Sequence, residues 1–442
     1  MLESSGAMLL KLVLFFQLVH VVNQVHFKFE TGIPGVALTN LIFGLVLVLM
    51  RGQQETVTAK PMLYKPLMYF YGALTLAFLW AQVRAFGEII DDLTYWKNAL
   101  FFPLFYFLFL RCRQDVKTTR WLIIWVLVIA AVAGLEGLRE GLDYGFGKFN
   151  PYRRASGPFG DDWHNANRAG VFYGMFMPMF VALVLFLKKR KLWQLAAIGG
   201  CILLAGGALA TYSRQAYFLI ILSIAVLLLR RSIIAAVAIG VLLVSLVGYL
   251  PDSVFQRVEE TKQESKGGEE EVDASTSSRW EIWEGGMKML ASNPIGVGLN
   301  RWKGEIGNFC KYKKMDAHNF YVLTLGECGP LGLAALLYLI YSLFGLAKFL
   351  RENRPGDDPE LQALTVGFTM CTLNMALGGI YGSPTLEGAV MAPYWALAGL
   401  LERYIHLKKM EAGGETPVAA ADEEPIESRF PLAAYISPGR RK

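Results

Sequence analysis

A chain of 442 residues with 54% hydrophobic and only 18% charged side chains has too little polar surface to be a soluble globular protein. Its net charge of +6 is unremarkable for this length and gives no reason to expect a nucleic acid partner. The five cysteines show no CxxC spacing, and three lie in apolar runs, so neither a disulfide framework, a zinc site nor another cofactor is expected.

Twelve apolar runs are long enough, or nearly long enough, to cross a bilayer. They lie at 7–25, 33–50, 62–83, 97–110, 121–142, 169–187, 192–211, 215–229, 233–250, 320–349, 362–381 and 385–401. The fourth and eighth runs are short and need flanking residues to complete a span. The first run contains Lys11, Gln17 and His20 and lacks a following small-residue cleavage site, so it is expected to remain as a membrane helix. The expected fold is an all-α polytopic membrane protein of about twelve transmembrane helices.

Basic residues gather in the loops that follow even-numbered spans, and the positive-inside rule places these loops in the cytoplasm. They are Arg51, Lys60, Lys65, Arg111, Arg113, Lys117, Arg120, Lys188, Lys189, Arg190, Lys191, Arg230, Arg231, Lys348, Arg351 and Arg354. Both termini are then cytoplasmic, and the loops 143–168, 211–214, 251–319 and 382–384 face outward. We expect spans one to nine in residues 1–250, a large outward-facing loop at 251–320, spans ten to twelve in residues 321–405, and a disordered cytoplasmic tail at 406–442.

Arginines also occur in the outward loops, where the same charge bias should remove them. Arg214 lies in a very short outer turn, and Arg153, Arg154 and Arg168 lie in or beside the loop 143–168. They are either lipid anchors that reach the phosphate layer or an anion site for a phosphorylated substrate. Guanidinium suits the second role because its planar fork binds phosphate oxygens in pairs and keeps its charge.

The long outer loop divides into two parts. Residues 262–273 form an acidic insert that is expected to be flexible and solvated. A helix is then predicted from the capping box of Ser278 and Glu281 to a stop at Asn293-Pro294. Its apolar stripe consists of Trp280, Trp283, Met287 and Leu290. Arg279 is expected in the first turn, where the helix dipole would help it bind phosphate. The alternative is a helix that lies on the membrane surface.

Asp316-Ala317-His318-Asn319 precedes the tenth span. His20, His26 and His406 are expected to pack in spans or their flanks, whereas His318 and His164 lie in outer loops. His318 is the candidate general base, because an ordinary histidine pKa suits proton transfer at neutral pH.

Other kinds of chemistry have weak signals. The pairs Asp91-Asp92 and Asp161-Asp162 give only a thin case for a divalent ion, and the sequence contains no HExxH or Gly-x-Ser-x-Gly motif. No metal is therefore expected in the site.

Three patches together resemble the O-antigen ligase and Wzy-type polymerase superfamily. They are Thr211-Tyr212-Ser213-Arg214, the segment from Ser278-Arg279-Trp280 to Ile295-Gly296-Val297-Gly298, and the segment from His318-Asn319-Phe320 to Gly329-Pro330-Leu331-Gly332. The resemblance is specific over about residues 205–345, and Cys328 departs from its pattern.

The resemblance implies a GT-C-like glycosyltransferase in the bacterial inner membrane, whose donor is a polysaccharide on undecaprenyl pyrophosphate. It implies that Arg214 and Arg279 bind the pyrophosphate and that His318 activates the acceptor hydroxyl in a metal-independent, inverting reaction. Arg154 and Arg168 are candidate extensions of the pyrophosphate site, which no motif places there.

The preferred acceptor is lipid A–core oligosaccharide, which would make the chain an O-antigen ligase. The alternatives are a polymerase or a protein O-oligosaccharyltransferase of the same superfamily and, more remotely, a lipid-linked glycan transporter. A transporter would carry its charges near the bilayer midplane, whereas the polar candidates here gather at one membrane face.

Overall fold

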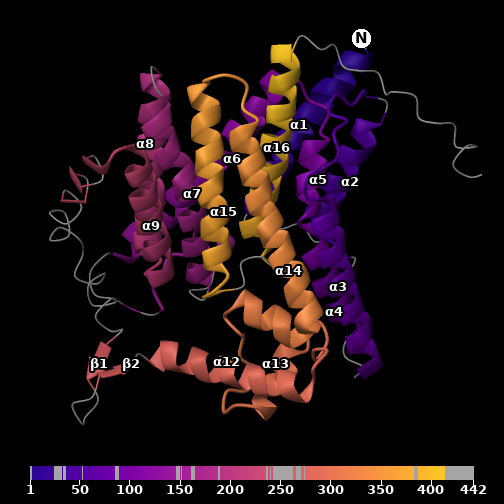
Figure 1. Ribbon diagram of the computed structural model, residues 1–442, viewed down its shortest axis with the longest axis vertical. Coiled ribbons are helices and arrows are strands. Elements are labelled where there is room, and N and C mark those ends of the chain that lie inside the picture. The colour runs from indigo at the N-terminus through magenta and orange to yellow at the C-terminus, as the bar shows by residue number, and fades with distance from the viewer. Residues whose placement is uncertain are drawn as a thin grey trace, which may run out of the picture.

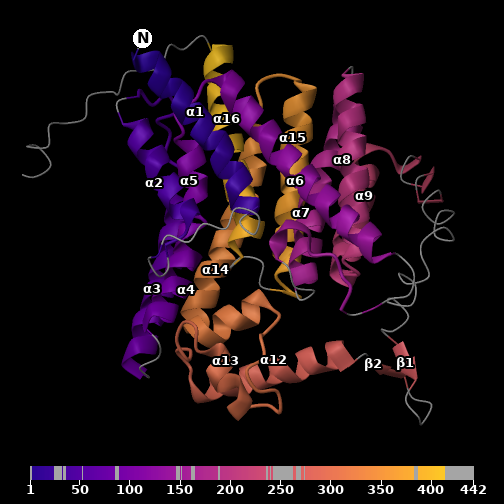
Figure 2. The ribbon, with the colours of Figure 1, turned by 180° about the vertical axis from the view of Figure 1, so that it is seen from behind.

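The computed structural model is a bundle of helices with a small helical layer across one end (Figure 1, Figure 2). It describes residues 2–23, 32, 36–51, 53–84, 89–145, 150, 152–160, 165–187, 190–234, 237–238, 240–241, 262–264, 270–272, 274–382 and 387–413. The elements are α1 (Leu2–Val22), α2 (Leu38–Met50), α3 (Tyr64–Arg84), α4 (Ile89–Phe101), α5 (Leu104–Leu110), α6 (Val116–Tyr144), η1 (Gly157–Phe159), α7 (Ala166–Phe186), α8 (Lys191–Ala210), α9 (Arg214–Arg231), β1 (Lys262–Glu264), β2 (Glu270–Val272), α12 (Ala274–Ser292), α13 (Trp302–Glu305), η4 (Ile306–Asn308), α14 (Phe320–Glu352), α15 (Pro359–Gly378) and α16 (Gly388–Gly413).

Among the described residues, eight helical segments are long and apolar enough to cross a membrane. The short run predicted at 97–110 is part of a longer segment, Ile89–Leu110, which contains α4 and α5. The two helices are separated at Pro103, because proline has no N–H to continue the hydrogen-bond ladder. The count of twelve spans stays a prediction, and most of its ninth span, 233–250, lies outside the described residues.

The most buried of these candidate spans, α7 and α15, pack together. The side chain of Asn374 in α15 is fully buried and joins them to α9. Its amide donates to the carbonyl oxygen of Gly174 in α7 at 2.7 Å and to Ser223 Oγ in α9 at 2.6 Å. In an apolar interior such bonds fix how neighbouring helices are aligned. This contact therefore joins α9, which begins at Arg214, to α7 and α15.

The bundle has two chemically different ends. The start of α1 and the last turns of α16 lie at the end opposite α12 (Figure 1, Figure 2). At that end Glu360 binds both Arg120 of α6 and Arg190, which precedes α8. Two of the basic residues predicted to share one membrane side, Arg120 and Arg190, therefore meet at one carboxylate. Residues 406–413 of the predicted disordered tail are helical, because α16 continues to Gly413, and residues 414–442 lie outside the described residues.

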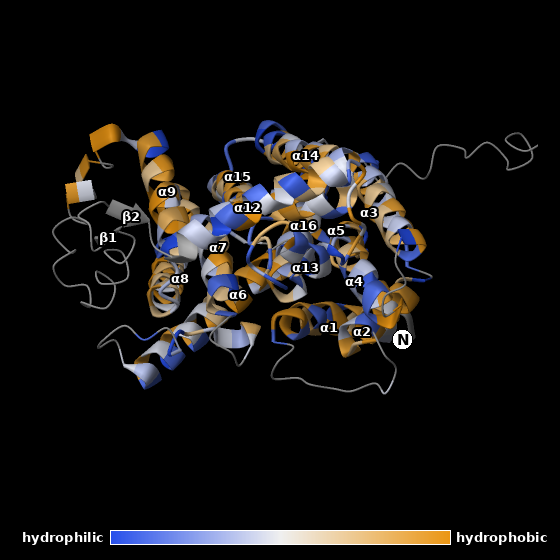
Figure 3. Cartoon of the chain, turned by 90° about the horizontal axis from the view of Figure 1, so that it is seen from below, coloured by the Kyte–Doolittle hydropathy of each residue, from blue (hydrophilic) through white to orange (hydrophobic). Residues whose placement is uncertain are grey.

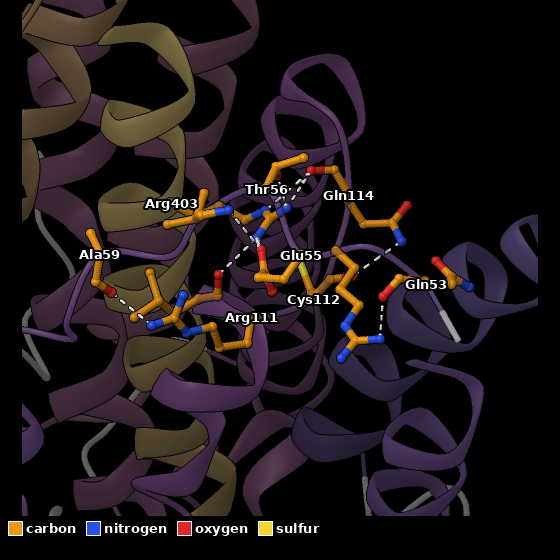
Figure 4. Close-up of polar contacts among 11 residues, drawn as sticks. Gln53, Glu55, Thr56, Ala59, Arg111, Cys112, Gln114 and Arg403 are labelled. Atoms are coloured by element: carbon orange, nitrogen blue, oxygen red, sulfur yellow. Dashed lines mark hydrogen bonds and ion pairs between the residues drawn. The ribbon is translucent and has the colours of Figure 1, made fainter. Parts of the chain in front are cut away.

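Arg403 of α16 is a fully buried charge at the same end (Figure 4). Its guanidinium lies 2.8 Å from a carboxylate oxygen of Glu55 and donates to the carbonyl oxygens of Leu110 and Gln114 at 2.9 and 2.7 Å. It also donates to the hydroxyl of Thr56. These bonds satisfy a cation that would otherwise be very costly to bury. They fasten α16 to the two loops that precede α3 and α6.

The layer across the other end consists of α12, α13 and η4, with α12 lying across the direction of the bundle helices (Figure 1). It has a small core of its own, formed by Ile282, Met289, Val297, Trp302, Ile306, Ala317 and Leu323. The acidic insert contains an antiparallel pair of short strands, β1 and β2.

Candidate functional site

His318 lies in the last turn of chain before α14, and three elements fix its backbone. The indole of Trp283 in α12 donates to the carbonyl oxygen of Ala317 at 2.8 Å. Asn319 caps α14 by accepting from two backbone N–H groups, and the N–H of Phe320 donates to the carbonyl oxygen of Gly379 at 2.7 Å. His318 itself has a φ of +47°, in the left-handed region that residues other than glycine rarely adopt. Strain of this kind persists only where the surroundings impose it, and it concentrates at functional sites.

The surroundings of His318 favour a neutral imidazole. Burial lowers the pKa of His318, and the positive charge of Arg279 lowers it further. Asp316 acts in the opposite direction, and Lys303 adds a weaker lowering effect. A histidine that is neutral at physiological pH can accept a proton, so the electrostatics suit a general base.

Arg279 lies near His318, but not at the helix position that the sequence predicted. α12 begins at Ala274, so Ser278 is inside the helix and Arg279 is in its second turn. The capping box is therefore wrong, because the preceding run of Ala, Ser and Thr contains no residue that stops a helix. The guanidinium carbon of Arg279 is 5.6 Å from the ring centre of Tyr381, a cation–π distance.

The predicted apolar stripe of α12 is also only partly correct. Trp280 and Met287 are more than half exposed, whereas Ile282 and Met289 face the small core. Trp283 is half-buried and contacts the ring of Tyr381 at 5.8 Å. Tyr381 thus joins the segment that follows α15 to the face of α12 that carries Arg279.

Arg214 is the first residue of α9 and so, unlike Arg279, lies at the N-terminus of its helix. Tyr212, with a φ of +50°, makes the tight turn from α8 into α9. The amide of Gln215 donates to the carbonyl oxygen of Gly378 at 2.8 Å, which joins the start of α9 to the end of α15. The next residue, Gly379, accepts the N–H of Phe320. Arg214 and His318 therefore flank the same end of α15.

Arg154 supports the turn that carries Arg214. It is only 7% exposed, and its Nε donates to the carbonyl oxygen of Thr211 at 2.8 Å. A second nitrogen donates to Oδ1 of Asn167 in α7 at 2.7 Å. The Arg154 side chain thus holds the 211–214 turn against the start of α7, as expected for a residue that positions its neighbours.

Arg168 lies in the first turn of α7 and forms an ion pair with Glu387 at 2.7 Å. Arg153 is exposed, and its backbone N–H bonds to Asn150. His164, Asp161 and Asp162 lie outside the described residues.

Sequence reasoning missed a carboxylate that interacts with two of the charged neighbours of His318. Glu387 precedes α16, and its carboxyl pKa is raised by burial, an effect that Arg168 opposes. Glu387 also interacts electrostatically with Asp316 and Lys303, which themselves form an ion pair at 3.1 Å. In the sequence, Glu387 is recognisable only as a carboxylate at the boundary between a loop and a helix. Many exposed acidic residues have the same position, so the pattern did not identify it.

Two of the patches identified in the sequence pack directly against each other. Gly329 in α14 has a φ of +67°, and Pro330 follows it, so the helical ladder is interrupted there. The freed carbonyl oxygens of Gly326 and Glu327 accept the N–H groups of Val297 and Gly298 at 2.9 and 3.0 Å. The turn after α12 therefore replaces the donors that α14 lacks.

Asp92, one of the weak metal candidates, has another role. Its carboxylate accepts from Gln82 at 2.8 Å, Asn300 at 2.9 Å and Arg301 at 2.7 Å. These donors come from α3 and from the loop between α12 and α13. Asp92 thus fastens the end layer to the bundle, and its oxygens are engaged by donors. Among the described residues, no group of three or more His, Cys, Asp or Glu side chains could hold a metal ion.

Residues 199–337 match the family model described as O-antigen ligase. The match includes the turn at 211–214, the whole of α12 and the segment that carries His318. A search of curated proteins found no match.

Proposed function

We propose, from the match of residues 199–337 to the O-antigen ligase family model, that this membrane protein is an O-antigen ligase. The proposed donor is a polysaccharide on undecaprenyl pyrophosphate, and the proposed acceptor is lipid A–core oligosaccharide. The observation that carries the proposal is that Arg214, Arg279 and His318, whose pKa is lowered by burial and by Arg279, all lie at one end of the bundle, around the end of α15. Glycosyl transfer from a pyrophosphate requires a group that accepts the proton of the acceptor hydroxyl. It also requires positive charge to stabilise the leaving pyrophosphate, which two fixed cations can supply.

In the proposed reaction His318 accepts the proton of an acceptor hydroxyl as its oxygen attacks the anomeric carbon of the donor sugar. A new glycosidic bond forms, the bond from that carbon to the pyrophosphate oxygen breaks, and the pyrophosphate leaves with the electron pair. Attack from the opposite face inverts the anomeric centre. Arg214 adds its charge to the free N–H groups at the start of α9, and Arg279 adds a second cation beside His318. Both stabilise the charge that develops on the leaving group.

The remaining arginines act on the site through their neighbours. Arg154 holds the turn that presents Arg214, and Arg168 holds Glu387 close to the Asp316–Lys303 pair. This proposal gives both a positioning role, in place of the pyrophosphate contact that the sequence suggested. The donor is presented at the periplasmic face of the inner membrane, so we place this end of the bundle there and both termini in the cytoplasm.

A reconstituted transfer assay tests the function. Purified protein in detergent is mixed with undecaprenyl-pyrophosphate-linked polysaccharide and lipid A–core, and the product is scored on a gel. His318→Ala is expected to lower transfer by about a hundred- to ten-thousand-fold while donor binding persists. Arg214→Ala and Arg279→Ala should abolish transfer or nearly so, and lysine should rescue only partly because it lacks the paired donors. Lys348→Gln, an exposed change on α14 at the other end, is the control. Wild-type rates in the His318 variant would remove the assigned base.

A cellular assay separates the ligase from a polymerase of the same superfamily. Cells that lack a ligase keep core without O-antigen and accumulate lipid-linked polymer. Cells that lack a polymerase keep core that bears a single repeat, and that profile would select the alternative.

The arginine-based mechanism predicts that transfer continues in excess EDTA. Permanent guanidinium charges stabilise the leaving pyrophosphate in place of a divalent ion held by carboxylates. The assay compares rates with and without chelator. Loss of activity that magnesium or manganese restores would contradict the mechanism.

A further inference from the structure

A cavity of about 280 Å³ lies between the start of α2 and the second half of α4. Its volume is close to the lower end of the range for small-molecule sites, about 300 Å³. Five polar side chains line it: Thr39, Asn40, Thr94, Lys97 and Asn98. None of these residues belongs to the site built around His318.

The polar residues on α4 follow the helical repeat. Thr94, Lys97, Asn98 and Phe101 are spaced i, i+3, i+4 and i+7, so they share one face of the helix. α4 belongs to a segment that is long and apolar enough to cross a membrane. An ionisable residue in such a segment is costly, and by default it indicates a functional site.

The opposite wall of the cavity has a second polar layer behind it. Thr39 is buried, its hydroxyl lies 3.1 Å from Nδ1 of His20 in α1, and its carbonyl oxygen accepts from the amide of Gln17. His20 therefore has polar neighbours, contrary to the expectation that it simply packs in a span. These contacts fix the first turn of α2, where Asn40 also binds the N–H of Ala37.

The lining has the chemistry of a saccharide site with a preference for negative charge. Hydroxyls and amides both donate and accept hydrogen bonds, as sugar hydroxyls require. The rings of Phe101 and Phe102 provide apolar faces that suit the C–H side of a sugar ring. Lys97 adds a cation, which favours a phosphate or carboxylate substituent. A pocket for a lipid chain would lack these polar groups.

One residue that lines the cavity, Phe102, connects it to the segment that leads to the proposed catalytic site. Phe102 covers Gly388 at the start of α16 so closely that an added Cβ would lie 2.0 Å from the phenyl ring. Glu387, the preceding residue, interacts with Asp316 and Lys303 beside His318. Seen from the end that α12 covers, α9 and α4 lie on opposite sides of the molecule (Figure 3), as they do in Figure 1. The cavity beside α4 and Arg214 at the start of α9 therefore lie on opposite sides of the bundle.

We infer that the cavity between α2 and α4 binds an acidic sugar of the acceptor, and so holds the acceptor while its hydroxyl reaches His318. This inference rests on the proposed transfer function. It assigns acceptor recognition to Lys97 and Asn98, which lie outside the segment matched by the family model.

The test measures binding and kinetics separately. Binding of phosphorylated lipid A–core, and of the same molecule after its phosphates have been removed, is measured on the His318→Ala protein with and without Lys97→Gln. The lysine change should weaken binding of the phosphorylated form by about ten- to hundredfold, because a charged hydrogen-bond donor is lost. The dephosphorylated form should bind weakly to both proteins. In active protein, Lys97→Gln should raise the acceptor KM and leave the donor KM unchanged.

Two further variants keep the result interpretable. Lys97→Arg keeps the charge and should retain most of the binding, and Lys348→Gln should change nothing. If Lys97→Gln folds poorly, Asn98→Ala replaces it and should also raise the acceptor KM alone. Unchanged acceptor binding, or a rise in donor KM alone, would overturn the inference while the transfer function stands. Binding to the cavity without transfer by wild-type protein would instead contradict the proposed function.

Discussion

The charge state of His318 depends on neighbours that lie on different elements. Arg279 on α12 and Lys303 on α13 lower its pKa, while Asp316 in the adjoining loop raises it. A base must be neutral before it can act, so its activity is lost as the pH falls through its pKa in the folded protein. The position of that acid limb therefore reports the balance of these charges.

Two exposed residues of opposite charge should move the acid limb in opposite directions. Removing the positive charge with Lys303→Gln raises the pKa of His318 and moves the limb to higher pH. Asp316→Asn removes the negative charge, lowers the pKa and moves the limb to lower pH. Both changes are at exposed side chains, so little loss of stability is expected. The pH profiles of kcat/KM check the prediction. Shifts of the same sign in both variants would show that His318 is not the titrating base.

Individual residues also show which parts of the candidate site could be predicted from the sequence and which could not. The types and spacing of Arg214, Arg279 and His318 were enough to select them as candidates. Tyr381 and Glu387 were missed because their role depends on tertiary contacts with residues that are far away in the chain. The sequence could not decide whether Arg154 is a lipid anchor. Its buried hydrogen bonds to Thr211 and Asn167 favour a positioning role instead.

At the scale of elements, the interrupted helix α14 connects the end layer to the bundle. The break at Gly329 and Pro330 frees two carbonyl oxygens, and the turn at 296–298 supplies donors to both. The same turn is followed by Arg301, whose ion pair with Asp92 anchors the layer to α4. The placement of α12, and hence of Arg279, therefore depends on a conformation that only glycine adopts easily at position 329.

Gly329→Ala should disrupt this junction. The added Cβ would lie 2.6 Å from the carbonyl oxygen of Ile295, and the φ of +67° is unfavourable for alanine. Transfer should fall by about tenfold or more, because small displacements of catalytic groups are costly. Gly345→Ala, in the same helix but facing open space, is the matched control and should retain activity. Equal activities in the transfer assay would contradict this role for the junction.

Helices were easier to predict from the sequence than their ends. Hydropathy located the long spans because lipid burial requires sustained apolar runs. The start of α12 was misplaced because Ser278 and Glu281 satisfy a capping pattern that the helix does not use. The polar face of α4 was missed because the predicted span began at Lys97, which left Thr94 outside it and hid the helical spacing of Thr94, Lys97 and Asn98.

At the scale of the whole molecule, the end opposite α12 is held together by charge. Arg403 should contribute strongly to stability, because its removal leaves Glu55 without its buried partner (Figure 4). Arg403→Met should cost about 3–5 kcal/mol and lower the melting temperature in detergent. Adding Glu55→Gln should recover part of the loss, and Lys348→Gln should have no effect. Melting curves of the four proteins check this, and an unchanged melting temperature for Arg403→Met would contradict it.

The two ends should also face different compartments, as the distribution of basic residues predicts. Arg120 and Arg190 meet at Glu360, at the end opposite α12, where Arg403 also lies. Translocating such basic loops is unfavourable, so the positive-inside rule keeps this end in the cytoplasm. Fusions of alkaline phosphatase, which is active only after export, should be inactive at residues 115, 189 and 355 and active at 265. Fusions of a fluorescent protein that matures only in the cytoplasm should give the reverse pattern, which controls for expression. A phosphatase signal at 115 with none at 265 would invert the orientation. His318 and its arginines would then face the cytoplasm, away from a donor presented in the periplasm.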